Sequence, residues 1–243
     1  MITELKSNCM PVSKDGKFSY NILFEDSFAD LPEAMTDLEL ETHKICIVTD
    51  SNVGPLYAET VKAELEKICS VCEIFTFPAG EENKNLEVVQ KLYTFLIEQH
   101  FDRKDLLVAL GGGVVGDLTG FTAATYLRGI RFIQIPTTLL AQVDSSIGGK
   151  TGVDFSRYKN MVGAFYMPKL VYMNLQTLSA LPERQTAFQN QRRVAFPSFR
   201  QPETQTGPVP VRFRHVSGRA DADRGAATRG MKNKRCSGKV IHG

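Results

Sequence analysis

The chain has 243 residues, of which 42% are hydrophobic and 23% charged, with a formal net charge of +2. These are ordinary values for a globular protein large enough to bury a core. No apolar run approaches the roughly 18 residues of a membrane span, and the N-terminus lacks the apolar segment of a signal peptide. A membrane protein is therefore excluded and a cytoplasmic location expected. The five cysteines are an odd number, and the Cys69–Cys72 pair has no partner pair at zinc spacing, which argues against a disulfide framework or zinc site.

The first part of the chain alternates predicted strands and helices. Strands are expected, in chain order, at 17–25 (alone or as a hairpin), 44–50, 73–77, 105–110 and 131–136. Helices are expected at 55–68, 85–100, 111–126 and 137–149, the last ended by glycines. This order predicts an α/β, Rossmann-like fold with a mostly parallel sheet and helices on both faces.

The pattern stops after Gln185. Residues 1–185 carry 17 basic and 24 acidic side chains, whereas residues 186–243 carry 12 and 3 and contain no leucine. The second segment also lacks a sustained period of 2 or 3.6. We therefore expect a folded domain over 1–185 and a disordered basic tail over 186–243. A solvated appendage is favoured over a nucleic-acid contact for this tail.

A glycine-rich turn follows the strand 105–110. Residues 111–117 read GGGVVGD and match GxGxxG between a strand and a helix. Such glycines let the backbone approach a diphosphate, and the helix start supplies N–H donors. The acidic residue expected about 20 positions later is missing, so an ordinary dinucleotide fingerprint is not predicted. A purely structural tight turn is the alternative.

A second loop, PAGEENK (78–84), follows the strand 73–77. Loops at the carboxyl ends of parallel strands are where ligands bind in such sheets, so Glu81 could accept from a ribose and Lys84 could reach a phosphate. On this motif alone a solvated helix start is the favoured interpretation.

A third group of polar residues follows the strand 131–136. GGKT (148–151) resembles the end of a phosphate loop, but the position of the first glycine is Asp144, so that interpretation is rejected. Asp144, Lys150, Lys159 and Asn160 form a polar set that suits a substrate with a carboxylate and a phosphate. Ordinary surface lysines are the alternative.

Together, PAGEENK, LGGGVVGDLTGFTAATYLRGI, FIQIPTTLLAQVDSSIGGKTGVD and YKNMVGAFYMPKLV resemble 3-dehydroquinate synthase over about residues 40–185. The resemblance implies an NAD-dependent lyase of the shikimate pathway, which leads to chorismate and the aromatic amino acids. It converts the sugar phosphate 3-deoxy-D-arabino-heptulosonate 7-phosphate to 3-dehydroquinate and phosphate. NAD and a divalent metal, zinc or cobalt, carry the hard steps. A homodimer and no membrane partner are implied.

The resemblance also assigns site residues. Asp144, Lys150 and Asn160 would contact substrate, and Arg128 would reach its phosphate across the dimer interface. The residues assigned to the NAD site are Asp50, Asn52, Gly80, Glu81, Lys84, Gly113, Val114, Val115, Gly116, Asp117, Thr137, Thr138, Lys150, Lys159, Thr177 and Leu178.

The chain departs from the family after Gln185. The family continues with G-x-A-E-x-I-K, whose Glu binds the metal, but the aligned residue here is Arg192. We therefore expect no metal ligands and no helical C-terminal domain in this chain, which would be a truncated or frameshifted, inactive form. Another sugar-phosphate cyclase and a non-catalytic nucleotide-binding remnant remain as alternatives.

Overall fold

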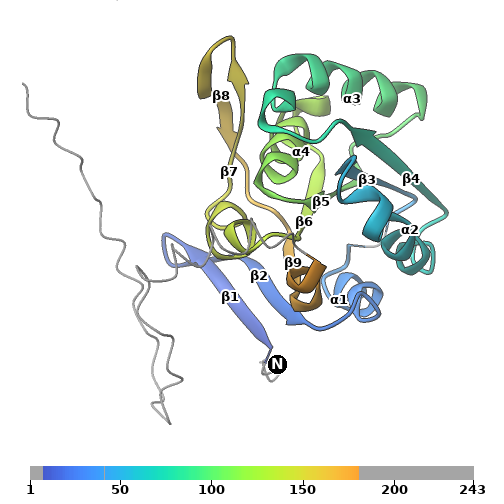
Figure 1. The fold of residues 1–243 in the computed structure, drawn as a ribbon. Helices are drawn as coiled ribbons and strands as arrows, with labels where there is room; N and C mark the ends of the chain where they lie inside the picture. Colours follow the sequence, from blue (N-terminus) through green and yellow to red (C-terminus); the bar gives the residue numbers. More distant parts are fainter. Residues whose placement is uncertain (1–7, 41, 181–243) are drawn as a thin grey trace, which may run out of the picture. The chain divides into compact units, whose positions relative to one another are not determined.

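The computed structural model describes residues 8–40 and 42–180, which lie in the first of two units of the chain, Met1–Pro197. Their elements follow one another from β1 to the 3-10 helix η4 (Figure 1). The strands are β1 (Cys9–Lys14), β2 (Lys17–Glu25), β3 (Lys44–Asp50), β4 (Val71–Phe77), β5 (Leu106–Gly111), β6 (Arg131–Pro136), β7 (Lys150–Phe155), β8 (Tyr158–Phe165) and β9 (Leu170–Asn174). The α-helices are α1 (Leu31–Thr36), α2 (Gly54–Leu65), α3 (Leu86–Glu98) and α4 (Gly113–Thr125).

Seven strands form one sheet in the order β1-β2-β9-β6-β5-β3-β4. All neighbours in it are parallel except β1 and β2, which pair antiparallel. The prediction of a Rossmann-like, mostly parallel sheet with flanking helices is confirmed for the described residues. β7 and β8 form a separate antiparallel hairpin, which stands beside α4 (Figure 1).

The central strands are buried on both faces because their residues alternate between two cores. Leu106, Val108 and Leu110 of β5 belong to the core that α1 and α2 cover. Leu107 and Ala109 belong to the core that α3 and α4 cover. Helices therefore lie on both faces of the sheet.

This arrangement places a topological switch point between β3 and β5. The two strands are neighbours, but the helices that follow them, α2 and α4, cover opposite faces. Their chains therefore separate at the carboxyl ends, where doubly wound sheets bind ligands. The register pairs Thr49 with Leu110, so Asp50 and Gly111 are neighbours at this edge.

The last predicted helix, 137–149, is wrong in length. A helical segment runs only from residue 139, and Ala141–Ser145 is a π-helix, η3. The chain then turns through Gly148 and Gly149, both at positive φ (93° and 65°), directly into β7. Because GGKT leads into a strand rather than a helix, the rejection of a phosphate loop is confirmed.

Candidate cofactor and substrate site

The glycine turn after β5 leaves backbone donors of α4 available. Gly112 is the extended residue before the helix, and no side chain caps the first turn. A Cβ on Gly113 would lie 3.0 Å from Ser145 Oγ, and one on Gly112 would lie 3.4 Å from Thr138 Cγ2. The turn is therefore narrow, and no side chain of the described residues caps the N–H groups at this positive end of a helix, an arrangement that suits a diphosphate.

Thr137 and Thr138 lie beside this turn. The Thr137 N–H donates to the Gly111 carbonyl (3.0 Å), while its hydroxyl is buried and has no hydrogen-bond partner among the described residues. Thr138 Oγ1 accepts from the Ala141 N–H (3.3 Å). A buried hydroxyl without a partner is costly, so Thr137 fits a position that a bound polar group completes.

Lys84 is buried at the same edge, with 4% of its surface exposed. Its Nζ donates to Asn160 Oδ1 on β8 (2.8 Å). The same Nζ lies 3.2 Å from Glu81, 3.4 Å from Asp117 on α4 and 4.0 Å from Asp154 on β7. The favoured interpretation of this loop as a solvated helix start is therefore wrong for Lys84, because these partners surround its ammonium group.

The charges in this cluster shift one another's pKa values. Burial lowers the Lys84 pKa, but the carboxylates of Asp117, Glu81 and Asp154 outweigh it and the pKa is raised. Burial raises the Asp117 pKa to about 6, against the opposing effect of Lys84. Lys84 is thus a stable cation, whereas Asp117 changes charge near neutral pH.

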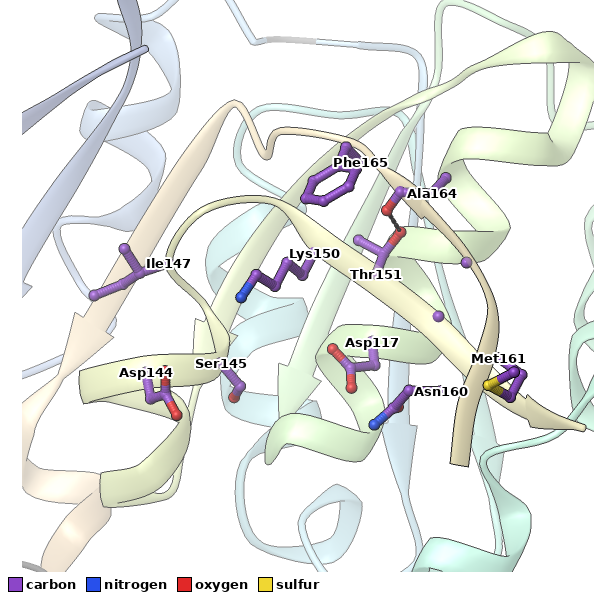
Figure 2. Close-up of a pocket in the computed structure, with 12 residues that line it drawn as sticks. Asp117, Asp144, Ser145, Ile147, Lys150, Thr151, Asn160, Met161, Ala164 and Phe165 are labelled. Atoms are coloured by element: carbon purple, nitrogen blue, oxygen red, sulfur yellow. Dashed lines mark hydrogen bonds between the residues drawn. The ribbon is translucent and has the colours of Figure 1, made fainter. Parts of the chain in front are cut away.

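Three of the four predicted substrate residues, all except Arg128, gather around one cavity of about 540 Å³. Figure 2 shows Asp144 on η3, Lys150 on β7 and Asn160 on β8 around this cavity together with Asp117. The structure adds Ser145, Thr151, Met161 and Phe165 to its walls. Sequence reasoning missed these, and it missed Asp154, because the resemblance assigned them no role, although all five lie within the motifs that carry it.

The other residues predicted to bind NAD lie on the PAGEENK loop, on the hairpin and near the starts of α2 and α4. The Glu81 carboxylate lies 3.5 Å from the Lys159 ammonium group on the hairpin. Asp50 Oδ1 accepts from the Asn52 and Val53 N–H groups (both 2.9 Å) and so shapes the start of α2. Gly80 has a φ of 124°, and Gly113, Val114, Val115 and Gly116 form the first turn of α4.

Thr177 and Leu178 lie on η4 (Leu175–Ala180). The Thr177 hydroxyl is buried and donates to the Asn174 carbonyl (2.7 Å), so it is already engaged within the chain. Gln142 of η3 donates to the Thr177 hydroxyl (3.4 Å), which ties η4 to η3.

Arg128 is not brought to the cavity within one chain. It lies just after the carboxyl end of α4, whose 13 residues begin at the glycine turn. At ~1.5 Å per residue, this helix separates it from that turn by roughly 20 Å. Arg128 and Leu127 both have positive φ (66° and 49°), a costly conformation that displays Arg128 to solvent.

No group of three or more His, Cys, Asp or Glu side chains that could hold a metal ion occurs within residues 8–40 and 42–180. None of the helices in that part of the chain has both the length and the apolar character needed to traverse a bilayer. Arg192 and the predicted basic tail lie outside the described residues.

Comparison with known proteins agrees with the geometry. Residues 74–188 match the family described as 3-dehydroquinate synthase N-terminal. The 3-dehydroquinate synthase of Acetivibrio thermocellus is 52% identical over 168 residues, which are 69% of this chain and 46% of that protein. The enzyme of the same name from Symbiobacterium thermophilum is 55% identical over 145 residues, 60% of this chain and 40% of that protein. The chain therefore spans about half the length of the curated relatives it matches.

Solved structures show the same fold. A 2-deoxy-scyllo-inosose synthase complexed with carbaglucose-6-phosphate, NAD+ and Co2+ has a TM-score of 0.67 and 29% identity, over 73% of this chain and 47% of that one. A 2-epi-5-epi-valiolone synthase from Streptomyces hygroscopicus with NAD+ and Zn2+ bound has a TM-score of 0.61 and 29% identity, over 72% and 48% of the two chains. The matched region, residues 74–188, is thus similar to the N-terminal domain of the 3-dehydroquinate synthases in both sequence and fold.

Proposed function

We propose that this chain is a 3-dehydroquinate synthase by descent whose residues 1–185 bind NAD at the carboxyl edge of the sheet. The observation that carries the proposal is the buried Lys84. Its contacts join the PAGEENK loop, α4 and the β7–β8 hairpin beside the glycine turn. The PAGEENK loop, the glycine-turn motif and the two motifs that make up the hairpin are separate in the sequence, and their side chains thus form one polar site.

The residues at this edge fit NAD, which supplies a hydride acceptor when bound. The free N–H groups of the first turn of α4 suit its diphosphate, and the unpartnered Thr137 hydroxyl suits a further polar contact. A carboxylate repels phosphate, so Asp117 and Glu81 suit hydroxyl or amide donors of the cofactor instead. Lys84 balances their charge.

The adjoining cavity fits a small polar substrate such as a sugar phosphate acid. The Lys150 ammonium group would attract its carboxylate or phosphate, while Asp144 and Asn160 would accept hydrogen bonds from its hydroxyls. Lys159 would contact the cofactor, and Asp50, Asn52, Thr177 and Leu178 would border it. Arg128 would serve the site of a second copy in a homodimer.

The described residues do not fit the divalent metal of the family, because they contain no suitable ligand group. In the family motif that follows Gln185, the position of the metal-binding Glu is occupied by Arg192. We therefore propose that the chain by itself releases little or no phosphate from the substrate. An assay showing metal-dependent phosphate release by this chain would contradict that.

The synthase is favoured over other sugar-phosphate cyclases by sequence identity. The curated 3-dehydroquinate synthases are 52% and 55% identical to this chain, whereas the inosose and valiolone synthases of known structure are 29% identical. A non-catalytic nucleotide-binding remnant would share the NAD site and differ only in lacking turnover.

Titration calorimetry of NAD into the full chain tests the proposal. We expect one saturable site, and at least a tenfold loss of affinity in Lys84→Met, which keeps the length of the side chain but removes its charge. Lys91→Met, at an exposed position of α3, is the matched control and should bind as the wild type does. Absence of heat from the wild type, or equal affinities of all three proteins, would sink the proposal.

A further inference from the structure

The hairpin β7–β8 is fastened to the PAGEENK loop by two reciprocal contacts. Lys84 of the loop donates to Asn160 of the hairpin (2.8 Å), and Lys159 of the hairpin lies 3.5 Å from Glu81 of the loop. The hairpin pairs with no strand of the main sheet. Its position over the cavity therefore depends on such contacts and on its packing against α4.

Asp154, to which the resemblance assigned no role, is the residue at which these contacts meet. Its N–H donates to the Lys84 carbonyl (2.8 Å), in an isolated bridge between Asn85 and Asp154. Its carboxylate accepts from the Asn160 N–H (2.7 Å) and lies 4.0 Å from Lys84 Nζ. Only 16% of its side chain is exposed, so solvent screens its attraction to the buried Lys84 less than that of a surface ion pair, whereas the bond from Asn160 N–H is exposed.

The backbone around Asp154 departs from a regular hairpin. The register shifts between Val153 and Phe155, so Asp154 lies at a bulge, a feature that re-aims neighbouring side chains. Across from it, Asn160 has a φ of 54°, a left-handed conformation that asparagine tolerates better than most residues. The bond from Asn160 N–H to Asp154 holds this conformation, and with it the Asn160 side chain that lines the cavity.

We infer that Asp154 is a positioning residue of the cofactor and substrate site. It holds Asn160 in the left-handed conformation and thereby positions the side chains of Asn160 and Lys84 beside that of Asp117. The inference rests on the proposed function. It assigns Asp154 no contact with the reacting atoms, because Asp154 does not line the cavity.

Two substitutions separate the hydrogen bond from the charge. Asp154→Ala removes both, whereas Asp154→Asn keeps an oxygen that can accept from the Asn160 N–H and removes only the charge. Glu59→Ala, which removes an exposed carboxylate from α2, is the control. Thermal unfolding of all variants shows whether the fold is kept.

Hydrogen exchange of the ligand-free chain is the first measurement. We expect the Asn160 amide to exchange at least about tenfold faster in Asp154→Ala, with the amides of β5 and β6 unchanged, and to recover most of its protection in Asp154→Asn. Unchanged exchange at Asn160 in Asp154→Ala, or no recovery in Asp154→Asn, would overturn the inference.

The second measurement is the affinity for NAD, determined by titration calorimetry. We expect a loss of about fivefold or more in Asp154→Ala, partial recovery in Asp154→Asn and no change in Glu59→Ala. If the wild type binds NAD and Asp154→Ala binds it equally well, the inference fails while the proposed function stands. If the wild type binds no NAD, the proposed function fails. The hydrogen-exchange measurement alone then decides whether Asp154 holds Asn160 in the left-handed conformation.

Discussion

At the scale of single residues, the chemistry of the site depends on a cation held among carboxylates. The sequence singled out Lys84, Glu81, Asp117 and Asn160 as candidates, but it could not show that Lys84 is buried. The reason is separation along the chain: Asp117 lies 33 residues from Lys84, and Asn160 lies 76 residues away. Asp154 was missed because its role comes from a bulge and a left-handed neighbour, neither of which a motif encodes.

The same cluster makes a prediction about stability. Lys84→Met should lower the free energy of unfolding by about 1–2 kcal/mol, because it leaves partly buried carboxylates without their cation. Urea unfolding monitored by circular dichroism measures this change. Lys91→Met should change it by less than about 0.5 kcal/mol, as exposed substitutions do; an equal loss in both variants would contradict the role of the cluster.

Asp117 makes the stability depend on pH. Its pKa of about 6 in the folded chain lies above its ordinary value of 3.8. The folded chain therefore binds more protons than the unfolded chain between these values, and the contribution of Asp117 to stability falls as pH rises through this window. The fall is at most about 3 kcal/mol, at ~1.4 kcal/mol per pKa unit. Asp117→Asn should lose this part of the pH dependence in urea unfolding, and an unchanged profile would contradict it.

At the scale of elements, apolar runs predicted best. β3 and β6 have the predicted bounds, because each is a short apolar run buried on both faces. β7 and β8 were not predicted, since the hairpin is rich in polar residues and glycine and stands outside the main sheet. β1, α1 and the buried β9 were not predicted either. The segment 137–149 has helical periodicity, but the glycine pair and the π-helix end it early.

The contact between α4 and β7 tests this packing. A Cβ on Gly120 would lie 2.4 Å from Thr151 Cγ2 and 3.2 Å from Phe132 Cζ. Gly120→Ala should therefore destabilise the chain by about 1–3 kcal/mol, although alanine normally stabilises a helix interior. Adding Thr151→Ser, which removes that methyl group but keeps the hydroxyl, should recover part of the loss in urea unfolding. A stable Gly120→Ala single variant would show that the two elements are not closely packed.

At the scale of the whole molecule, the order of elements was enough to predict the doubly wound sheet, and hence the edge at which the motifs meet. The π-helix and the hairpin that complete the cavity depend on contacts between distant segments, so the sequence alone could not place them. Ligand binding should stabilise the folded state as a unit. At an NAD concentration of 100 times the dissociation constant, the free energy of unfolding should rise by about 2.7 kcal/mol. Calorimetric melting with and without NAD measures this rise, and an unchanged melting temperature would count against a folded-state site.

The most direct measurement is a crystal structure of the full chain grown with NAD. We expect the diphosphate against the N–H groups of Gly113 and Val114, with Lys84 and Thr137 beside the cofactor. A cofactor bound elsewhere, or an empty glycine turn at saturating NAD, would contradict it.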